Sequence, residues 1–173
     1  IGYLIDVYRE KFEPERNPAK YALFVSFFPQ LIQGPISFYD QLAHQLYAER
    51  NFSYKNLKHG TLLILWGYFK KMVIADRAVS LIQMVAPDYM QYNGTVIFIT
   101  VLVYALQLYA DFSGGIDISR GFAEILGIEM AENFCRPYFA VSINDYWRRW
   151  HITLGAWMKN YVFYSLAMSK RFF

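Results

Sequence analysis

The sequence predicts an all-α membrane protein that crosses the bilayer several times, with broken or re-entrant helices and helices that lie along the interface. Residues 89–110 contain no charged side chain, and a helix needs about 20 apolar residues to cross about 30 Å of hydrocarbon. The other apolar stretches are interrupted by proline, glycine or lysine. Aromatic residues make up 20% of the 173 residues, as in proteins with aromatic belts at both membrane interfaces.

The N-terminal part of the chain is not predicted to contain a simple span. Residues 1–20 are rich in charged side chains and include a proline-bounded loop, so we expect a solvent-exposed connector. Residues 21–39 are uncharged but contain Pro29, Gly34 and Pro35. Helix-breaking residues are tolerated at membrane depth where the backbone is buried in protein or lines a polar cavity. We therefore predict a broken or re-entrant segment here.

A helix is predicted to begin after Ser53 and to run through residues 54–69. A serine side chain at that position accepts a hydrogen bond from an unpaired N–H group of the first turn. Two lysines follow directly, and Asp76 and Arg77 come soon after. If the helix continues, these charges fall in or beside the bilayer. We expect Asp76 and Arg77 to lie at the membrane surface or to face a wet interior.

The best candidate for a simple span has its core at residues 94–109. Behind it, Asp111 and Asp117 flank the pair Gly114-Gly115. Because glycine permits tight turns, we expect the chain to turn here and to re-enter the protein as a new amphipathic helix. The two acids then either cap this turn or line a polar channel. Gly127 is expected to end the new helix.

Another helix is predicted to begin after Ser142, because Ser142 and Asp145 match the S-x-x-D/E pattern of a helix start. Asn144, Trp147 and His151 recur at i, i+3 and i+7. Residues at this spacing share one face of an α-helix. We therefore expect the three side chains to point in the same direction.

The segment 144–157 is the densest group of candidate functional residues. It combines tryptophans and arginines with a histidine, namely Trp147, Arg148, Arg149, Trp150, His151 and Trp157. Such a helix can lie at the interface, with indoles at headgroup level and guanidinium groups on phosphates, and this is the expectation for Trp150 and Trp157. Asp145 and Arg149 have the spacing of an ion pair worth about 0.2–0.5 kcal/mol.

His151 differs in kind, because an imidazole titrates near neutral pH. It can take a proton from an attacking hydroxyl or return one to a leaving group. A lone histidine among tryptophans is more often a hydrogen-bonded interfacial residue. The residues alone therefore leave both roles open.

Composition excludes several function classes. The formal charge of +3 arises from 17 basic and 14 acidic residues, too balanced for a nucleic-acid partner. The single cysteine, Cys135, excludes an internal disulfide and a cysteine-based zinc site, and we expect it to pack. His44 and His59 lie in polar segments and are predicted to be solvated. There is no G-x-S-x-G, HExxH, Walker A or dinucleotide motif, and no metal site is expected.

Five segments resemble, in the same order, motifs of the membrane-bound O-acyltransferase family, specifically its alginate O-acetyltransferase branch. They are FFPQLIQGPI at 27–36, GYFKKMVIADR at 67–77, YADFSGGID at 109–117, ENFCRPY at 132–138 and YWRRWHITLGAW at 146–157. Each match is weak alone, but five in order make chance a poor explanation.

The resemblance implies a ring of membrane helices around a tunnel, in a multi-pass protein of the bacterial inner membrane. An acyl donor, acetyl-CoA or an acyl carrier, would arrive from the cytoplasmic side, with no bound cofactor. A polysaccharide or cell-wall glycan hydroxyl would be acylated on the far side, with the help of partner proteins. Residues 1–173 would then be the central fragment of a single membrane domain that lacks its N-terminal and C-terminal helices.

By position, His151 corresponds to the first functional histidine of the family. The second lies in a later segment beyond Phe173, so the fragment alone is expected to be inactive. Supporting or tunnel-lining roles are expected for Trp147, Arg148, Arg149, Trp150, Asp111, Asp117 and Asn160. Asn160 stands where the family often has aspartate, which leaves an acid-base role of that position in doubt.

Two alternatives remain open from the sequence. The first is D-alanyl transfer to teichoic acid, a related activity of the same fold. Arg148-Arg149 and Ile152-Thr153 fit the acetyl branch better. The second is a transporter or channel without enzymatic activity, in which Asp76, Asp111 and Asp117 would line the pathway.

Overall fold

The computed structural model describes residues 1–31 and 33–167, and within these ranges the chain is helical with no strand beyond one isolated β-bridge. The predicted all-α class is confirmed for them. Ile32, which belongs to the first motif quoted above, lies outside the described residues, as do residues 168–173. The α-helices are α1 (Gly2–Tyr8), α2 (Pro18–Ser26), α3 (Tyr39–Tyr47), α4 (Tyr54–Tyr68), α5 (Asp76–Val85), α6 (Gly94–Ile125), α7 (Ile143–Arg149), α8 (Ile152–Trp157) and α9 (Tyr164–Ala167).

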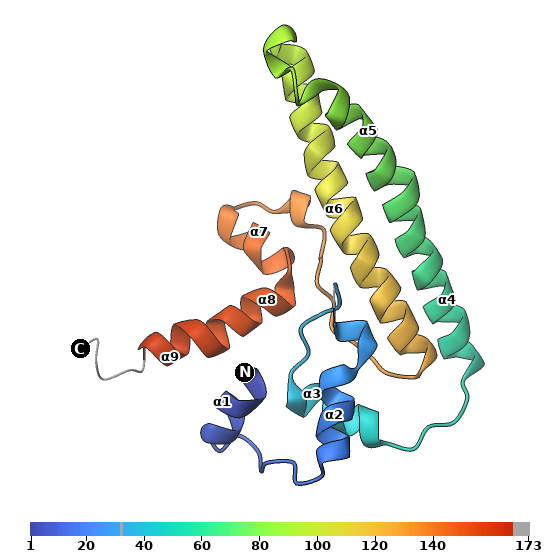
Figure 1. The fold of residues 1–173 in the computed structure, drawn as a ribbon, viewed down its shortest axis with the longest axis vertical. Coiled ribbons are helices and arrows are strands. Elements are labelled where there is room, and N and C mark those ends of the chain that lie inside the picture. The colour runs from blue at the N-terminus through green and yellow to red at the C-terminus, as the bar shows by residue number, and fades with distance from the viewer. Residues whose placement is uncertain (32, 168–173) are drawn as a thin grey trace.

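A long helical hairpin dominates the fold (Figure 1). One arm consists of α4, a π-helix at Phe69–Ala75 and α5 in direct succession, and the other arm is α6. The side chain of Ser53 accepts a hydrogen bond from the N–H of Asn56 at 3.3 Å, so the predicted helix start is confirmed. The side chain of Asn93 caps α6 by accepting from the N–H of Val96 at 3.0 Å.

Two pairs of glycines form the seam between the arms. A Cβ atom built on Gly67 would lie 2.6 Å from the carbonyl oxygen of Gly114, and one on Gly121 would lie 2.6 Å from that of Gly60. The absence of side chains lets the two backbones approach closely, which is a common way to pack helices in membranes.

We expect Gly67→Ala and Gly121→Ala to destabilise the protein by about 1–3 kcal/mol, the usual cost of overpacking. A loss of stability is informative here, because alanine in place of glycine inside a helix ordinarily stabilises the helix by up to about 1 kcal/mol. Thermal unfolding of the solubilised full-length protein measures the effect. Gly94→Ala is the matched control, since a Cβ at Gly94 would meet no atom within 4 Å. Equal melting temperatures for all three variants would contradict this account of the seam.

The predicted turn at Gly114-Gly115 is wrong, because α6 runs without interruption from Gly94 to Ile125. The two glycines serve close packing instead. Gly114 lies against Gly67, and a Cβ on Gly115 would clash with the side chain of Gln33. Asp111 and Asp117 therefore lie inside a continuous helix and do not cap a turn.

The predicted end of this helix is confirmed. Gly127 has a left-handed backbone with φ of +74°. Its N–H donates to the carbonyl of Glu124 at 2.8 Å, and the N–H of Ile128 donates to the carbonyl of Ala123 at 2.8 Å. These two bonds satisfy carbonyls that the last helical turn would otherwise leave unpaired.

Among the described residues, α6 is the one helix whose length and composition would allow it to cross a membrane. Its most apolar window has a mean hydropathy of 1.7, and only 6% of that window is buried. The predicted span at residues 94–109 thus falls within a helix of suitable length. Large apolar side chains on both arms are exposed, among them Leu62, Trp66, Phe98 and Leu102.

The remaining helices lie along one side of the hairpin, away from its 86–93 tip (Figure 1). Residues 21–39 are broken as predicted, since α2 ends at Ser26, a 3-10 turn follows at Phe28–Gln30, and residues 33–38 before α3 are not helical. Phe24, Phe27 and Leu42 from this part form a core with Ala123 of α6 and with residues that follow it. This core attaches the small helices to the hairpin.

The prediction of a solvent-exposed connector over residues 1–20 is wrong for Asp6, which is buried. The hydroxyl of Tyr161 donates to a carboxylate oxygen of Asp6 at 2.6 Å. Arg9 donates to the carbonyl oxygen of Asn160 at 2.9 Å. Polar contacts between residues at opposite ends of the sequence therefore fix this charged segment to the C-terminal helices.

Candidate active site

His151 lies on a tight turn between α7 and α8, and not within one helix as predicted. Its backbone is left-handed, with φ 46° and ψ 56°. Trp150 before it is extended and forms the β-bridge with Phe134. Asn144 and Trp147 are on α7, so the prediction that all three side chains share one helix face is wrong. The reason is a contact with a distant segment, which interrupts the helix at Arg149.

The start of α7 follows the prediction. The side chain of Ser142 accepts from the N–H of Asp145 at 3.1 Å. Asp145 in turn accepts from Arg149 Nε at 2.9 Å and from the N–H of Val141 at 3.2 Å. The hydrogen bond from the Arg149 guanidinium, followed by that from Val141, lowers the pKa of Asp145 below its ordinary value. α7 is thus a short helix with a capped start and an ion pair along its length.

The imidazole of His151 is half-buried in aromatic surroundings. Its ring meets Phe112 of α6 edge to face, with centroids 4.9 Å apart at 82°. Nδ1 is buried and has no hydrogen-bond partner among the described residues. Burial lowers the pKa of His151 below the ordinary value of 6.5, because an apolar environment disfavours the charged imidazolium. This shift favours the neutral form of the ring.

His151 lines a cavity of about 330 Å³. The other lining residues are Trp147, Trp150, Leu154, Gly155 and Met158. The site thus brings together two of the predicted tryptophans and the histidine. A mostly apolar cavity with one convergent polar group is the usual form of a small-molecule site.

Trp150 lies in an aromatic cluster that joins α6 to α7. It stacks on Tyr146 at 5.7 Å and 16° and meets Phe134 edge to face at 4.9 Å. Tyr109 and Tyr138 complete the cluster. Trp150 is thus partly buried against aromatic side chains of its own chain.

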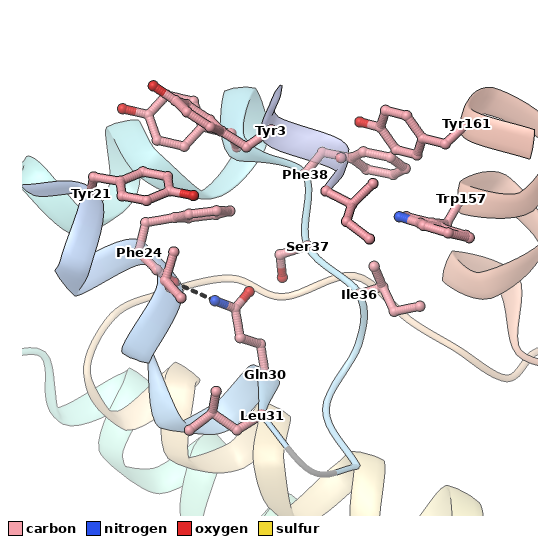
Figure 2. A pocket seen from close by; sticks show the side chains of 14 residues that line it. Tyr3, Tyr21, Phe24, Gln30, Leu31, Ile36, Ser37, Phe38, Trp157 and Tyr161 are labelled. Atoms are coloured by element: carbon pink, nitrogen blue, oxygen red, sulfur yellow. Dashed lines mark hydrogen bonds between the residues drawn. The ribbon is translucent and has the colours of Figure 1, made fainter. Parts of the chain in front are cut away.

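A second, aromatic-walled cavity of about 360 Å³ lies beyond the other end of α8 (Figure 2). Trp157, Tyr161, Phe38 and Ile36 lie near one another on its wall, and the rings of Phe38 and Tyr161 have centroids 5.8 Å apart. Its polar groups include Gln30, whose side-chain amide donates to the carbonyl of Phe24. Trp157 is thereby placed in a different cavity from His151.

The other predicted site residues lie elsewhere. Arg148 is exposed on α7, and Arg149 pairs with Asp145. Asn160 lines a separate cavity with Asp6, Arg9 and Lys11. Cys135 is exposed, so its predicted packing role is wrong. Within residues 1–31 and 33–167, no three histidine, cysteine or acidic side chains are placed to hold a metal ion.

Asp111 and Asp117 are both paired with lysines of the opposite arm. Lys70 is buried, and its Nζ lies 2.6 Å from Asp117 Oδ2 and 2.9 Å from Ser113 Oγ. Lys71 bonds Asp111. Both lysines reach the same helix, α6, although adjacent side chains of an ideal α-helix point about 100° apart. They lie in the π-helix Phe69–Ala75. A π-helical turn carries an extra residue and is frequent at functional sites.

The sequence reasoning missed three residues around His151. Phe112 packs on the imidazole. Asn133 and Thr153 are buried and hydrogen-bond each other beside the turn. Asn133 falls within the motif ENFCRPY, which is the one signal that could have pointed to it.

Comparison with known proteins gives consistent matches. A family model described as MBOAT, membrane-bound O-acyltransferase family, matches residues 14–173. A probable alginate O-acetylase of Pseudomonas fluorescens is 35% identical over 173 residues, covering 99% of this chain and 34% of that protein. The peptidoglycan O-acetyltransferase of Helicobacter pylori is 40% identical over 149 residues, 85% of this chain and 28% of that protein.

A teichoic acid D-alanyltransferase of Bacillus subtilis is 30% identical over 144 residues, 81% of this chain and 36% of that protein. The chain spans about a third of the length of the curated relatives that it matches. The motif resemblance drawn from the sequence is confirmed by these matches.

Proposed function

Because the chain belongs to the membrane-bound O-acyltransferase family, we propose that the whole protein transfers an acetyl group to hydroxyls of an exported polysaccharide or cell-wall glycan. The relatives named for acetyl transfer to alginate and peptidoglycan support this choice. The observation that carries the proposal is the half-buried imidazole of His151 on the wall of an apolar cavity.

Such an imidazole can assist acyl transfer. The acceptor hydroxyl oxygen attacks the carbonyl carbon of a thioester, and the carbon–sulfur bond breaks. The hydroxyl proton passes through a nitrogen base to the leaving sulfur, so the reaction needs no external oxidant or reductant. A neutral histidine can accept this proton or donate a hydrogen bond to the carbonyl oxygen. Apolar walls exclude water, which would otherwise compete for the acyl group.

The donor is proposed to be acetyl-CoA or an acyl carrier, and no resident cofactor is required. Trp147 and Trp150 share the cavity with His151 and are proposed to contact the substrates. The other predicted site residues, Asp111, Asp117, Arg148, Arg149 and Asn160, do not line this cavity. For Asp111 and Asp117 we propose a supporting role through the helix hairpin.

We further propose that the whole protein is a multi-pass bundle in the bacterial inner membrane. Residues 1–173 would form the central part of its single membrane domain. The long apolar helix α6 and the exposed apolar side chains on both arms support burial against lipid or further helices. Partner proteins of an acetylation complex are part of the same proposal.

Isotope labelling tests the acyl group. Cells that express the full-length protein are fed labelled acetate or labelled D-alanine, and the ester-linked label on purified envelope polymers is measured by mass spectrometry. We expect label from acetate, lost when the gene is deleted. D-alanine label in its place would overturn acetyl transfer and establish the second candidate, which the 30% identity to a D-alanyltransferase brings into view.

The transporter alternative gains no support from the ion pairs. A transport pathway would need charges free to meet the cargo, but Asp117 and Asp111 are paired with Lys70 and Lys71 between the hairpin arms. Asp76 is exposed at the start of α5. Polymer esters that persist after deletion of the gene would revive this alternative.

A further inference from the structure

A buried residue, Asn133, holds the side of the turn that follows His151. Its side chain is almost fully enclosed, with 1% of the residue exposed. Asn133 Oδ1 accepts hydrogen bonds from the Thr153 N–H at 2.9 Å and from the Thr153 hydroxyl at 2.6 Å. The backbone carbonyl of Asn133 accepts from the N–H of Ile152 at 3.0 Å. Three bonds therefore fix the two residues that follow His151.

The preceding side of the turn is fixed by the same segment. The N–H of Cys135 donates to the carbonyl of Arg149 at 3.0 Å, and Phe134 forms the β-bridge with Trp150. Residues 133–135 thus bond the chain both before and after His151. His151 itself adopts a left-handed backbone, which is strained for a residue other than glycine and persists only where the surroundings over-determine it.

The hydroxyl of Thr153 extends this arrangement to a third segment. It donates to Asn133 Oδ1 and accepts from the N–H of Ile36 at 3.0 Å. A group that donates and accepts at once is required at this position, and a hydroxyl supplies both. Ile36 belongs to the extended chain after Gly34-Pro35. Asn133 and Thr153 therefore tie the turn to two distant parts of the fold.

We propose that Asn133, acting through the Thr153 hydroxyl and the left-handed turn, is a positioning residue that aims the imidazole of His151 into its cavity. This inference rests on the proposed function for the consequence in catalysis, but the geometry can be tested without it. Phe112 packs on one side of the ring, so a change in the turn would move the imidazole against a fixed neighbour. A displacement of about 1 Å in a reacting group can lower a rate about a hundredfold.

The test uses Thr153→Val, which keeps the shape of the side chain and removes the hydroxyl, and Thr153→Ser, which keeps the hydroxyl. Asn133→Ala is the second disruptive variant. Each full-length protein is treated with diethyl pyrocarbonate over a range of pH, and modification of each histidine is followed by mass spectrometry of the digest. His44 and His59 lie on α3 and α4, away from the turn, and report on the rest of the fold.

We expect Thr153→Val and Asn133→Ala to speed modification of His151 several-fold and to return its pKa toward the ordinary value, because the released ring is better solvated. His44 and His59 should be unchanged, and Thr153→Ser should match the wild type. In the acetyl-transfer assay, kcat should fall about ten- to a hundredfold for Thr153→Val and Asn133→Ala, with KM changed less than about threefold.

Unchanged reactivity of His151 in both disruptive variants would overturn the positioning role. A parallel rise at all three histidines would also overturn it, because that pattern indicates general loosening. A wild-type protein without acetyl transfer would count against the proposed function alone. In that case the reactivity pattern of His151 would still decide the inference about Asn133.

Discussion

Replacing His151 with asparagine is expected to lower acetyl transfer by the full-length protein about 10²- to 10⁴-fold, the usual contribution of a positioned acid-base group. Asparagine is the informative choice, because it tolerates the left-handed backbone that His151 adopts. The turn between α7 and α8 should therefore survive while the imidazole is lost. The measurement is the rate of polymer acetylation in membranes that contain equal amounts of each protein.

His59→Asn serves as the control for this experiment. His59 is exposed on α4, and its ring lies 3.5 Å from Glu124, outside the cavity of His151. We expect its activity to remain within about twofold of the wild type, as surface substitutions away from a site have small effects. Full activity of His151→Asn would remove the imidazole from the mechanism. Equal melting temperatures of the two variants would show that lost activity is not lost folding.

The features predicted well from the sequence depend on local chemistry. The start of α4 at Ser53, the start of α7 at Ser142 and the end of α6 at Gly127 are each fixed by side chains or backbone bonds within a few residues. The same is true of the Asp145–Arg149 ion pair within α7. Such signals can be read from spacing alone.

The features predicted wrongly depend on partners that are distant in the sequence. Gly114 and Gly115 were expected to make a turn, but their neighbours are Gly67 and Gln33, which no local pattern reveals. The helix over residues 143–151 was expected to continue, but the segment that begins at Asn133 interrupts it at Trp150. The second error matters most, because it concealed the backbone conformation of His151.

The lysines of the π-helix provide the largest expected effect on stability. Lys70→Met is predicted to destabilise the protein by about 3–5 kcal/mol, because it leaves the Asp117 carboxylate largely enclosed without its closest partner. The side chains of Lys70 and Asp117 are only 9% and 15% exposed. Asp117→Leu should cost a similar amount, since the ammonium of Lys70 would lose its carboxylate partner and keep its hydrogen bond to the hydroxyl of Ser113. Thermal unfolding of the solubilised full-length protein measures both.

Lys71→Met is the matched control on the neighbouring residue. Its pair with Asp111 is more open, with side chains 37% and 35% exposed, so solvent screening limits the expected loss to about 0–1 kcal/mol. Equal losses for the two lysine variants would contradict the assignment of Lys70 as the buried partner.

The double variant Lys70→Met with Asp117→Leu should recover most of the stability lost in either single variant. Replacing both members of a buried ion pair with apolar side chains of similar size is often neutral or stabilising, whereas removing one partner leaves a buried charge uncompensated. Arg120, which lies 3.9 Å from Asp117, also contacts Glu132 at 3.2 Å, so it keeps a carboxylate partner in the double variant. If the destabilisation in the double variant equals the sum of the two single losses, Lys70 and Asp117 stabilise the protein independently. That result would contradict the claim that their ion pair joins the two arms of the hairpin.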